Sequence, residues 1–141
     1  MATAAASLPS LQPSRAFVGS RASRIVGRVL SGLAIAFLAL DAVAKVVLVP
    51  QVVEASAALG FPATTVFTLG VVLLASTLLY AYPRTSILGA VLLTGYLGGA
   101  IATHVRLGDP LFTHVLFPAY LGLFVWGGVY LRDARVRAFF R

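Results

Sequence analysis

Four long apolar stretches constrain the fold of this chain more than any other feature. They cover about residues 26–49, 63–82, 86–105 and 111–131, and each has the roughly 20 residues that an α-helix needs to cross a bilayer. Backbone N–H and C=O groups find no water in the hydrocarbon core, so a spanning segment must be helical. Of the 141 residues, 60% are hydrophobic and 11% are charged, a composition too apolar for a soluble domain. The sequence therefore predicts an all-α membrane protein, a bundle of four transmembrane helices.

Short segments that contain Gly, Pro and polar residues separate the four spans. Residues 51–59 are expected to form a short interfacial helix that ends at Gly60. The link over 83–86 contains Thr and Ser, whose hydroxyl groups can cap the start of the third span. The link over 108–110 reads Gly-Asp-Pro, which predicts Asp109 as the N-cap and the proline as the first residue of the fourth helix. These signals place tight turns between the spans.

The positive charges are distributed unevenly between the two sides of the predicted bundle. Of the 11 Lys and Arg residues, only Lys45 and Arg106 fall on one side, and nine fall on the other. Because Lys and Arg are enriched in cytoplasmic segments, this asymmetry predicts that both termini lie in the cytoplasm. The nine residues are Arg15, Arg21, Arg24, Arg28, Arg84, Arg132, Arg135, Arg137 and Arg141.

The first 24 residues differ in composition from the rest of the chain. They are rich in Ala, Ser, Pro and Arg and contain no acidic residue, which is typical of a disordered tail. Two alternatives stay open: a transit peptide of the same composition, and a secretory signal with an apolar core over 30–40 and a small-x-small site at 42–44. The apolar run continues through 46–49, which favours an uncleaved span. We therefore expect a tail over 1–24 and a transmembrane domain over 25–141.

Composition and motifs exclude several classes of function. The net charge is +7, but the arginines cluster at the ends of apolar stretches, which indicates contact with anionic lipids and no nucleic-acid partner. The chain has no cysteine, which excludes disulfides, Cys-based metal or iron–sulfur sites and thiol catalysis. No phosphate loop, nucleophile elbow or zinc-protease motif is present. The two histidines, His104 and His114, are only a weak signal for haem or metal ligation, so we predict no metal site, and no visible motif names a cofactor.

Asp41 and Lys45 are two charged residues inside the first apolar stretch. They are four residues apart, so they share one face of a helix. A charge at the centre of a spanning helix costs about 2.5–3.5 kcal/mol on insertion scales. The pair therefore indicates either the lining of a functional site or an i, i+4 ion pair in which Lys45 extends toward the membrane surface.

Most of the remaining polar groups fall near the same outer membrane face, which predicts a polar pocket open to that side. Each has a structural alternative: Asp109 as a helix cap, Arg106 as an anchor to lipid phosphate, His104 bonded to a carbonyl, His114 facing water, and Glu54 as a solvated loop charge. The candidate ligand-binding residues are Asp41, Lys45, His104, Arg106, Asp109 and His114.

The third span contains small residues that favour close helix packing. Gly95 and Gly99 have GxxxG spacing, and such residues allow membrane helices to approach closely. We expect these two glycines to form a packing face, with His104 pointing well away from it on the helical wheel.

Two runs of the sequence resemble the DoxX-like family of small bacterial four-helix membrane proteins. The first, over residues 93–138, reads LTGYLGGAIATHVRLGDPLFTHVLFPAYLGLFVWGGVYLRDARVRA, and GGAIATH followed by GDPLFTH is its most specific part. The second is LSGLAIAFLALDAVAKVVLVPQVVEASAALGFP, upstream. The likeness covers about residues 28–138 and implies a multi-pass protein of the bacterial inner membrane. It implies no established catalytic residues, so whether the chain is an enzyme stays open.

The resemblance implies a link to membrane redox systems, because the family takes its name from a subunit associated with thiosulfate:quinone oxidoreduction. Three functions follow as hypotheses. The first is an accessory protein that binds a small amphipathic or quinone-like molecule in the outer pocket and serves a redox partner. The second is an oxidoreductase subunit acting on quinone with a partner, with His104 transferring protons. The third is a scaffold of a membrane complex, or a homo-oligomer, that docks through the glycine face.

Overall fold

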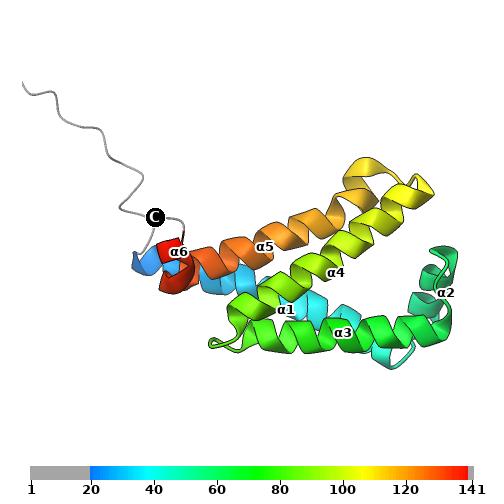
Figure 1. Cartoon of the computed structure of the whole chain (residues 1–141), viewed down its shortest axis with the longest axis horizontal. Coiled ribbons are helices and arrows are strands. Elements are labelled where there is room, and N and C mark those ends of the chain that lie inside the picture. Colours follow the sequence, from blue (N-terminus) through cyan, green and yellow to red (C-terminus); the bar gives the residue numbers. More distant parts are fainter. Residues whose placement is uncertain (1–19, 140–141) are drawn as a thin grey trace, which may run out of the picture.

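The computed structural model describes residues 20–139, which form an all-helical chain (Figure 1). Six α-helices and one short π-helix follow one another along these residues. Four segments are long and apolar enough to span a membrane, which confirms the predicted class. The elements are α1 (Arg21–Val46), α2 (Pro50–Ala58), α3 (Ala63–Ala81), α4 (Ser86–Leu107), η1 (Leu111–Val115), α5 (Phe117–Arg132) and α6 (Ala134–Phe139).

The predicted spans agree with the structure except at some ends. α1 begins at Arg21, five residues before the expected 26, because the hydroxyl of Ser20 accepts a hydrogen bond from the Ser23 amide and caps the helix. The helix therefore includes the last residues assigned to the tail, and residues 1–19 of that tail lie outside the described residues. The short helix expected over 51–59 is confirmed as α2, and α6 was not predicted.

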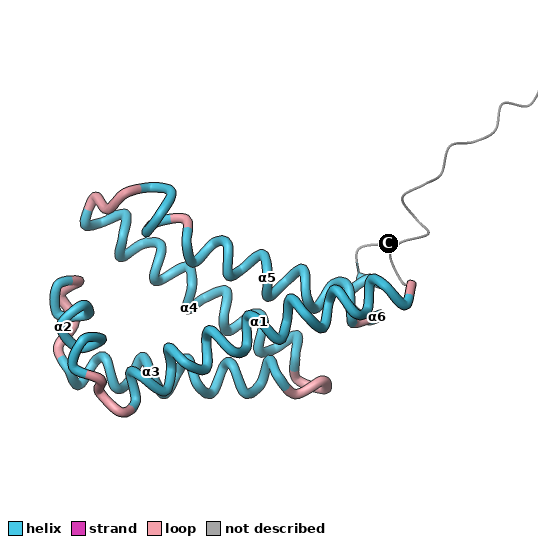
Figure 2. The backbone as a smooth tube through the Cα atoms, turned by 180° about the vertical axis from the view of Figure 1, so that it is seen from behind, coloured by secondary structure: helices cyan, strands magenta, loops and turns pink. Residues whose placement is uncertain are grey.

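The fourth span is not one continuous helix. Its first turn, η1, is a π-helix in which the Leu116 amide donates to the Leu111 carbonyl at 2.9 Å. α5 then begins at Phe117, with Pro118 in its first turn. Proline lacks the N–H that would continue an α-helical ladder from the preceding turn, so the span is interrupted there. The interruption turns η1 away from the axis of α5 (Figure 2).

The four long helices form a ring in the order α1, α3, α4, α5. At one end, which we call the closed end, the long helices come together beside α6. At the opposite end, which we call the open end, they separate into two arms, α1 with α3 and α4 with α5 (Figures 1 and 2). α2 and η1 both lie at the open end.

Tyr80 of α3 connects three helices at the closed end. Its side chain is fully buried, and its hydroxyl donates to the Val125 carbonyl of α5 at 2.9 Å and lies 2.9 Å from the Ser31 hydroxyl of α1. The Arg132 guanidinium lies 5.0 Å from the centre of the Tyr80 ring and donates to the Tyr80 carbonyl. Hydrogen bonds between apolar helices and a buried cation–π contact favour a single arrangement of this end.

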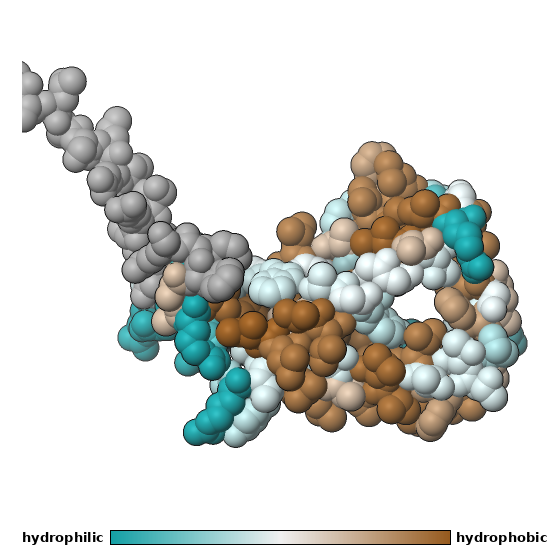
Figure 3. Space-filling model, in the orientation of Figure 1, coloured by the Kyte–Doolittle hydropathy of each residue, from teal (hydrophilic) through white to brown (hydrophobic). Residues whose placement is uncertain are grey.

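Glycines allow the helices to approach closely along these contacts. A Cβ on Gly89 would overlap the backbone of Tyr80, and one on Gly128 would overlap the hydroxyl of Ser31. At Gly27 a Cβ would lie 2.9 Å from the Arg132 amide nitrogen. Small residues have this role in membrane helix packing. The outer faces carry exposed Leu, Val and Phe side chains instead, as a bilayer requires (Figure 3).

Candidate functional site

A cavity of about 850 Å³ lies between the two arms at the open end. Helices α1, α2, α3, α4 and the start of α5 all contribute to its wall. Most of the lining is apolar, and Asp41, Lys45 and His104 are its ionisable residues apart from one tyrosine. The space-filling view shows the molecule hollowed between the arms (Figure 3). An apolar cavity with a few polar groups is typical of a site for an amphipathic ligand.

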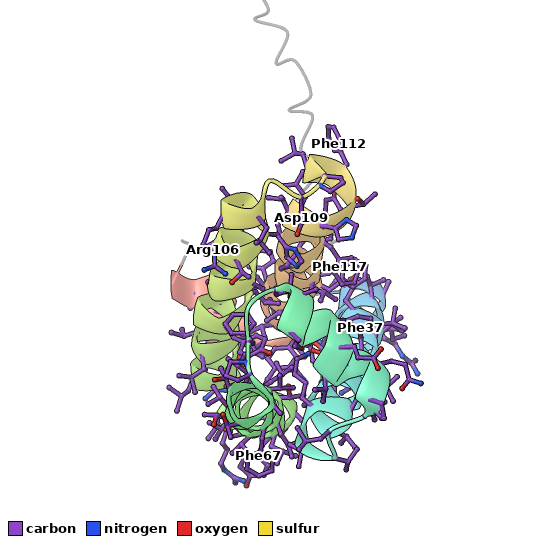
Figure 4. All side chains as sticks on the ribbon, turned by 90° about the vertical axis from the view of Figure 1, so that its right-hand side faces the viewer. Phe37, Phe67, Arg106, Asp109, Phe112 and Phe117 are labelled. Atoms are coloured by element: carbon purple, nitrogen blue, oxygen red, sulfur yellow. The ribbon has the colours of Figure 1, made fainter. Side chains whose placement is uncertain are left out.

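α2 covers the cavity at the open end. Gln51, Val52 and Ser56 of this helix belong to the lining. Figure 4 looks onto this end and shows α2 in front of the space between the arms. The Arg106 guanidinium of α4 donates to the Leu59 carbonyl at 3.0 Å, which ties the second arm to the end of α2. Arg106 thus closes the site from outside and is not part of the lining.

Asp41 and Lys45 form the ion pair that their spacing predicts. Both lie on the cavity wall, and their side chains are 33% and 16% exposed. A Cβ on Gly70 of α3 would lie 2.7 Å from the Lys45 Cβ, so Lys45 sits against a residue seven positions into α3. At 1.5 Å per residue that is about 10 Å from the start of the helix. Lys45 lies in the last turn of α1, Asp41 lies one turn further into the span, and both face the cavity.

His104 and Asp109 are bonded to each other, with His104 Nδ1 and Asp109 Oδ2 2.6 Å apart. The expectation that Asp109 caps the fourth span is wrong, because no side chain caps η1 and its N-cap residue is Pro110. Gly108, with φ of +71°, turns the chain sharply after α4 and brings the carboxylate back to the imidazole. Asp109 does not itself line the cavity but holds a residue that does.

His114 lies beside His104 but outside the cavity. The two imidazole rings meet edge to face, with centroids 5.8 Å apart. The side chain of His114 is exposed, and its Nδ1 lies 2.8 Å from the Thr113 hydroxyl. Among residues 20–139, no three His, Cys, Asp or Glu side chains come together as a metal site would require. Glu54 is also exposed and outside the cavity.

Sequence reasoning missed several lining residues. Tyr96 of α4 lies on the wall. Ser76 and Gln51 add polar atoms from α3 and α2. A tyrosine in the middle of an apolar span was the available signal for Tyr96. Nothing in the sequence indicates that α2 folds over the arms.

Gly95 and Gly99 do not pack against another of the described helices. A Cβ on either residue would meet no neighbouring atom within 4 Å, whereas the close approaches occur at Gly27, Gly70 and Gly89. Both glycines instead line the cavity. The helices diverge at this level, so GxxxG spacing alone did not identify the contact. Docking of these glycines against a second protein stays a prediction.

Comparison with known protein families gives a match. A family model described as the DoxX-like family matches residues 29–128, which includes all four spans in whole or in large part. Neither the curated proteins nor the solved structures include a match to this chain.

Proposed function

The chain belongs to the DoxX-like family, and from that premise we propose that it binds a small amphipathic molecule in the cavity at the open end. Asp41, Lys45 and His104 would hold the polar head of the ligand, while the apolar wall would hold its tail. The observation that carries the proposal is the ion pair within a spanning helix, on the wall of a largely apolar cavity. Ionisable groups inside a membrane protein are expensive and usually serve a ligand or an ion.

The three head-group residues offer complementary hydrogen bonds. Lys45 provides donors and Asp41 provides acceptors. Asp109 occupies Nδ1 of His104, so Nε2 is the nitrogen that can serve a ligand. An acidic partner at one nitrogen sets the tautomer and orientation of the ring. A quinone suits this set, since its carbonyl oxygens accept hydrogen bonds and its reduced hydroxyls donate them. Asp109 is a positioning residue in this scheme.

The redox setting is part of the proposal. The family resemblance links such proteins to membrane quinone chemistry, and we infer an accessory role beside a redox partner in the bacterial inner membrane. The chain has no cysteine, so electrons would come from the partner or from a bound cofactor. The open end would then face away from the cytoplasm.

Small-molecule mass spectrometry of the protein purified in mild detergent tests the proposal. We expect a quinone or another defined amphipathic molecule with the wild type, and its loss in Asp41→Asn and His104→Ala. Glu54→Gln is the matched control, because Glu54 is an acid near the same end that lies outside the cavity. Asp109→Asn should keep more ligand than Asp109→Ala, since the amide oxygen can still accept from Nδ1. Bulk phospholipid alone, equal in all variants, would refute ligand binding at this site.

A further inference from the structure

Helices α3 and α4 are joined at the closed end and diverge from there. The backbones meet where Gly89 lies against Tyr80, close to the loop that joins the two helices. Beyond that contact the two helices separate toward the open end, as both opposite views show (Figures 1 and 2). The space between them is continuous with the cavity, because both helices contribute lining residues along this stretch.

The residues at the edge of this space belong both to the cavity and to the outer surface. Val72 of α3 is 48% exposed, and Val91 and Leu92 of α4 are 53% and 43% exposed, yet all three line the cavity. An apolar edge at this depth faces lipid tails when the helices span a bilayer. The cavity is therefore open sideways to the hydrocarbon region between α3 and α4.

The other directions out of the cavity are crossed by contacts. α2 and the bond from Arg106 to the Leu59 carbonyl lie across the open end. On the side of α1 and α5, the rings of Phe37 and Phe117 meet edge to face with centroids 5.4 Å apart (Figure 4). No hydrogen bond or ring contact between described residues crosses the gap between α3 and α4 at the level of the cavity.

We propose that the gap between α3 and α4 is a lateral portal through which the apolar chain of the ligand extends into the bilayer. The ligand class is then a polar head on one long acyl or isoprenoid chain, which enters from the membrane and not from water. This inference rests on the proposed function, since it concerns the same cavity. It explains how a ligand with a long apolar chain reaches head-group residues near the outer ends of α1 and α4 while α2 covers the solvent-facing end.

Gly95 and Gly99 form the floor of the portal. Both line the cavity, both are exposed, and a Cβ on either would meet no atom of residues 20–139 within 4 Å. Larger side chains at these positions would fill space that the ligand chain needs. Gly98 offers a matched control on the same helix, because it is also exposed and uncrowded but is not a lining residue.

The test compares two probes on purified protein in nanodiscs of phosphatidylcholine and phosphatidylglycerol. One probe is decylubiquinone, and the other is the same benzoquinone ring without its chain. We expect Gly95→Leu and Gly99→Leu, made separately, to weaken binding of decylubiquinone by about tenfold or more, since one methylene in an apolar site changes discrimination by about 10- to 200-fold. Binding of the chain-free ring, and both probes with Gly98→Leu, should match the wild type.

The outcomes separate the portal from the binding site. Equal binding of decylubiquinone by all three glycine variants would refute the portal and leave the pocket intact. Loss of both probes in Gly95→Leu and Gly99→Leu would assign these glycines to the head-group pocket and also overturn the portal. Absence of binding by the wild type would refute the proposed function, and the portal with it.

Discussion

Gly128 provides the sharpest test of how the closed end is packed. It lies where α5 meets α1, and a Cβ there would overlap the Ser31 hydroxyl. The same Cβ would lie 3.0 Å from the Ser31 amide nitrogen and 3.1 Å from the Tyr80 hydroxyl. A hydroxyl can rotate away, but the amide nitrogen moves only if α1 moves. Gly128→Ala should therefore push α1 and α5 apart and disturb the hydrogen bonds of Tyr80.

The expected loss of stability follows from two opposing terms. Forcing an extra methyl group into a packed contact costs about 1–3 kcal/mol. Replacing glycine by alanine within a helix stabilises the helix by up to about 1 kcal/mol, because alanine has the higher helix propensity. Gly127→Ala is the matched control, because its Cβ would meet only the Leu30 Cδ1, at an ordinary 3.7 Å. Both variants gain the same propensity, so Gly128→Ala should be less stable than Gly127→Ala by about 1–3 kcal/mol.

Reversible unfolding in mixed micelles of increasing dodecyl sulfate content measures this difference. The single tryptophan, Trp126, lies in α5 and donates to the Thr94 hydroxyl of α4 at 2.8 Å, so its fluorescence should report the separation of these helices. A Ser31→Gly change in the Gly128→Ala background removes the overlapping hydroxyl and should recover part of the loss. Equal free energies of unfolding for the two alanine variants would show that the helices are not in contact at Gly128.

Two further predictions concern the closed end. Hydrogen bonds from Arg135 hold the pKa of Asp133 below its ordinary value, and Arg135 also donates to the Pro83 carbonyl at 2.9 Å. A depressed pKa means that the pair stabilises the fold at neutral pH and that this contribution is lost as the pH falls through the folded-state pKa. The free energies of unfolding of the wild type and of Asp133→Asn should therefore differ at neutral pH and converge at low pH. A difference that stays constant from neutral to acidic pH would contradict this. The charge asymmetry places the C-terminus in the cytoplasm, so a reporter enzyme that works only in the cytoplasm should be active when it is fused after Arg141. Activity of a reporter that works only outside the cytoplasm would show that the orientation is reversed.

The two ends of the bundle have different physical characters, and this contrast is relevant to the site. The closed end combines close backbone contacts at glycines with buried hydrogen bonds around Tyr80. The open end keeps its helices apart around a cavity that contains an ion pair. Packing and interhelical hydrogen bonds hold membrane helices together, because lipid offers no hydrophobic drive between them. A closely packed closed end can therefore support arms that leave space for a ligand.

The four spans and their helical character were determined by the sequence alone, because an apolar segment of that length must satisfy its backbone hydrogen bonds internally in a bilayer. The i, i+4 pair of Asp41 and Lys45 was also predictable, since helical periodicity puts both on one face. Those effects are local to one segment. They required no knowledge of how the spans pack.

Tertiary structure alone decided which surfaces face each other. Gly95 and Gly99 have the spacing of a packing motif, yet they line a cavity, because α4 has already diverged from α3 at that level. Asp109 reads as a helix cap, yet the left-handed turn at Gly108 directs its carboxylate to His104. Neither outcome can be read from one segment, since each depends on where a second segment lies in space.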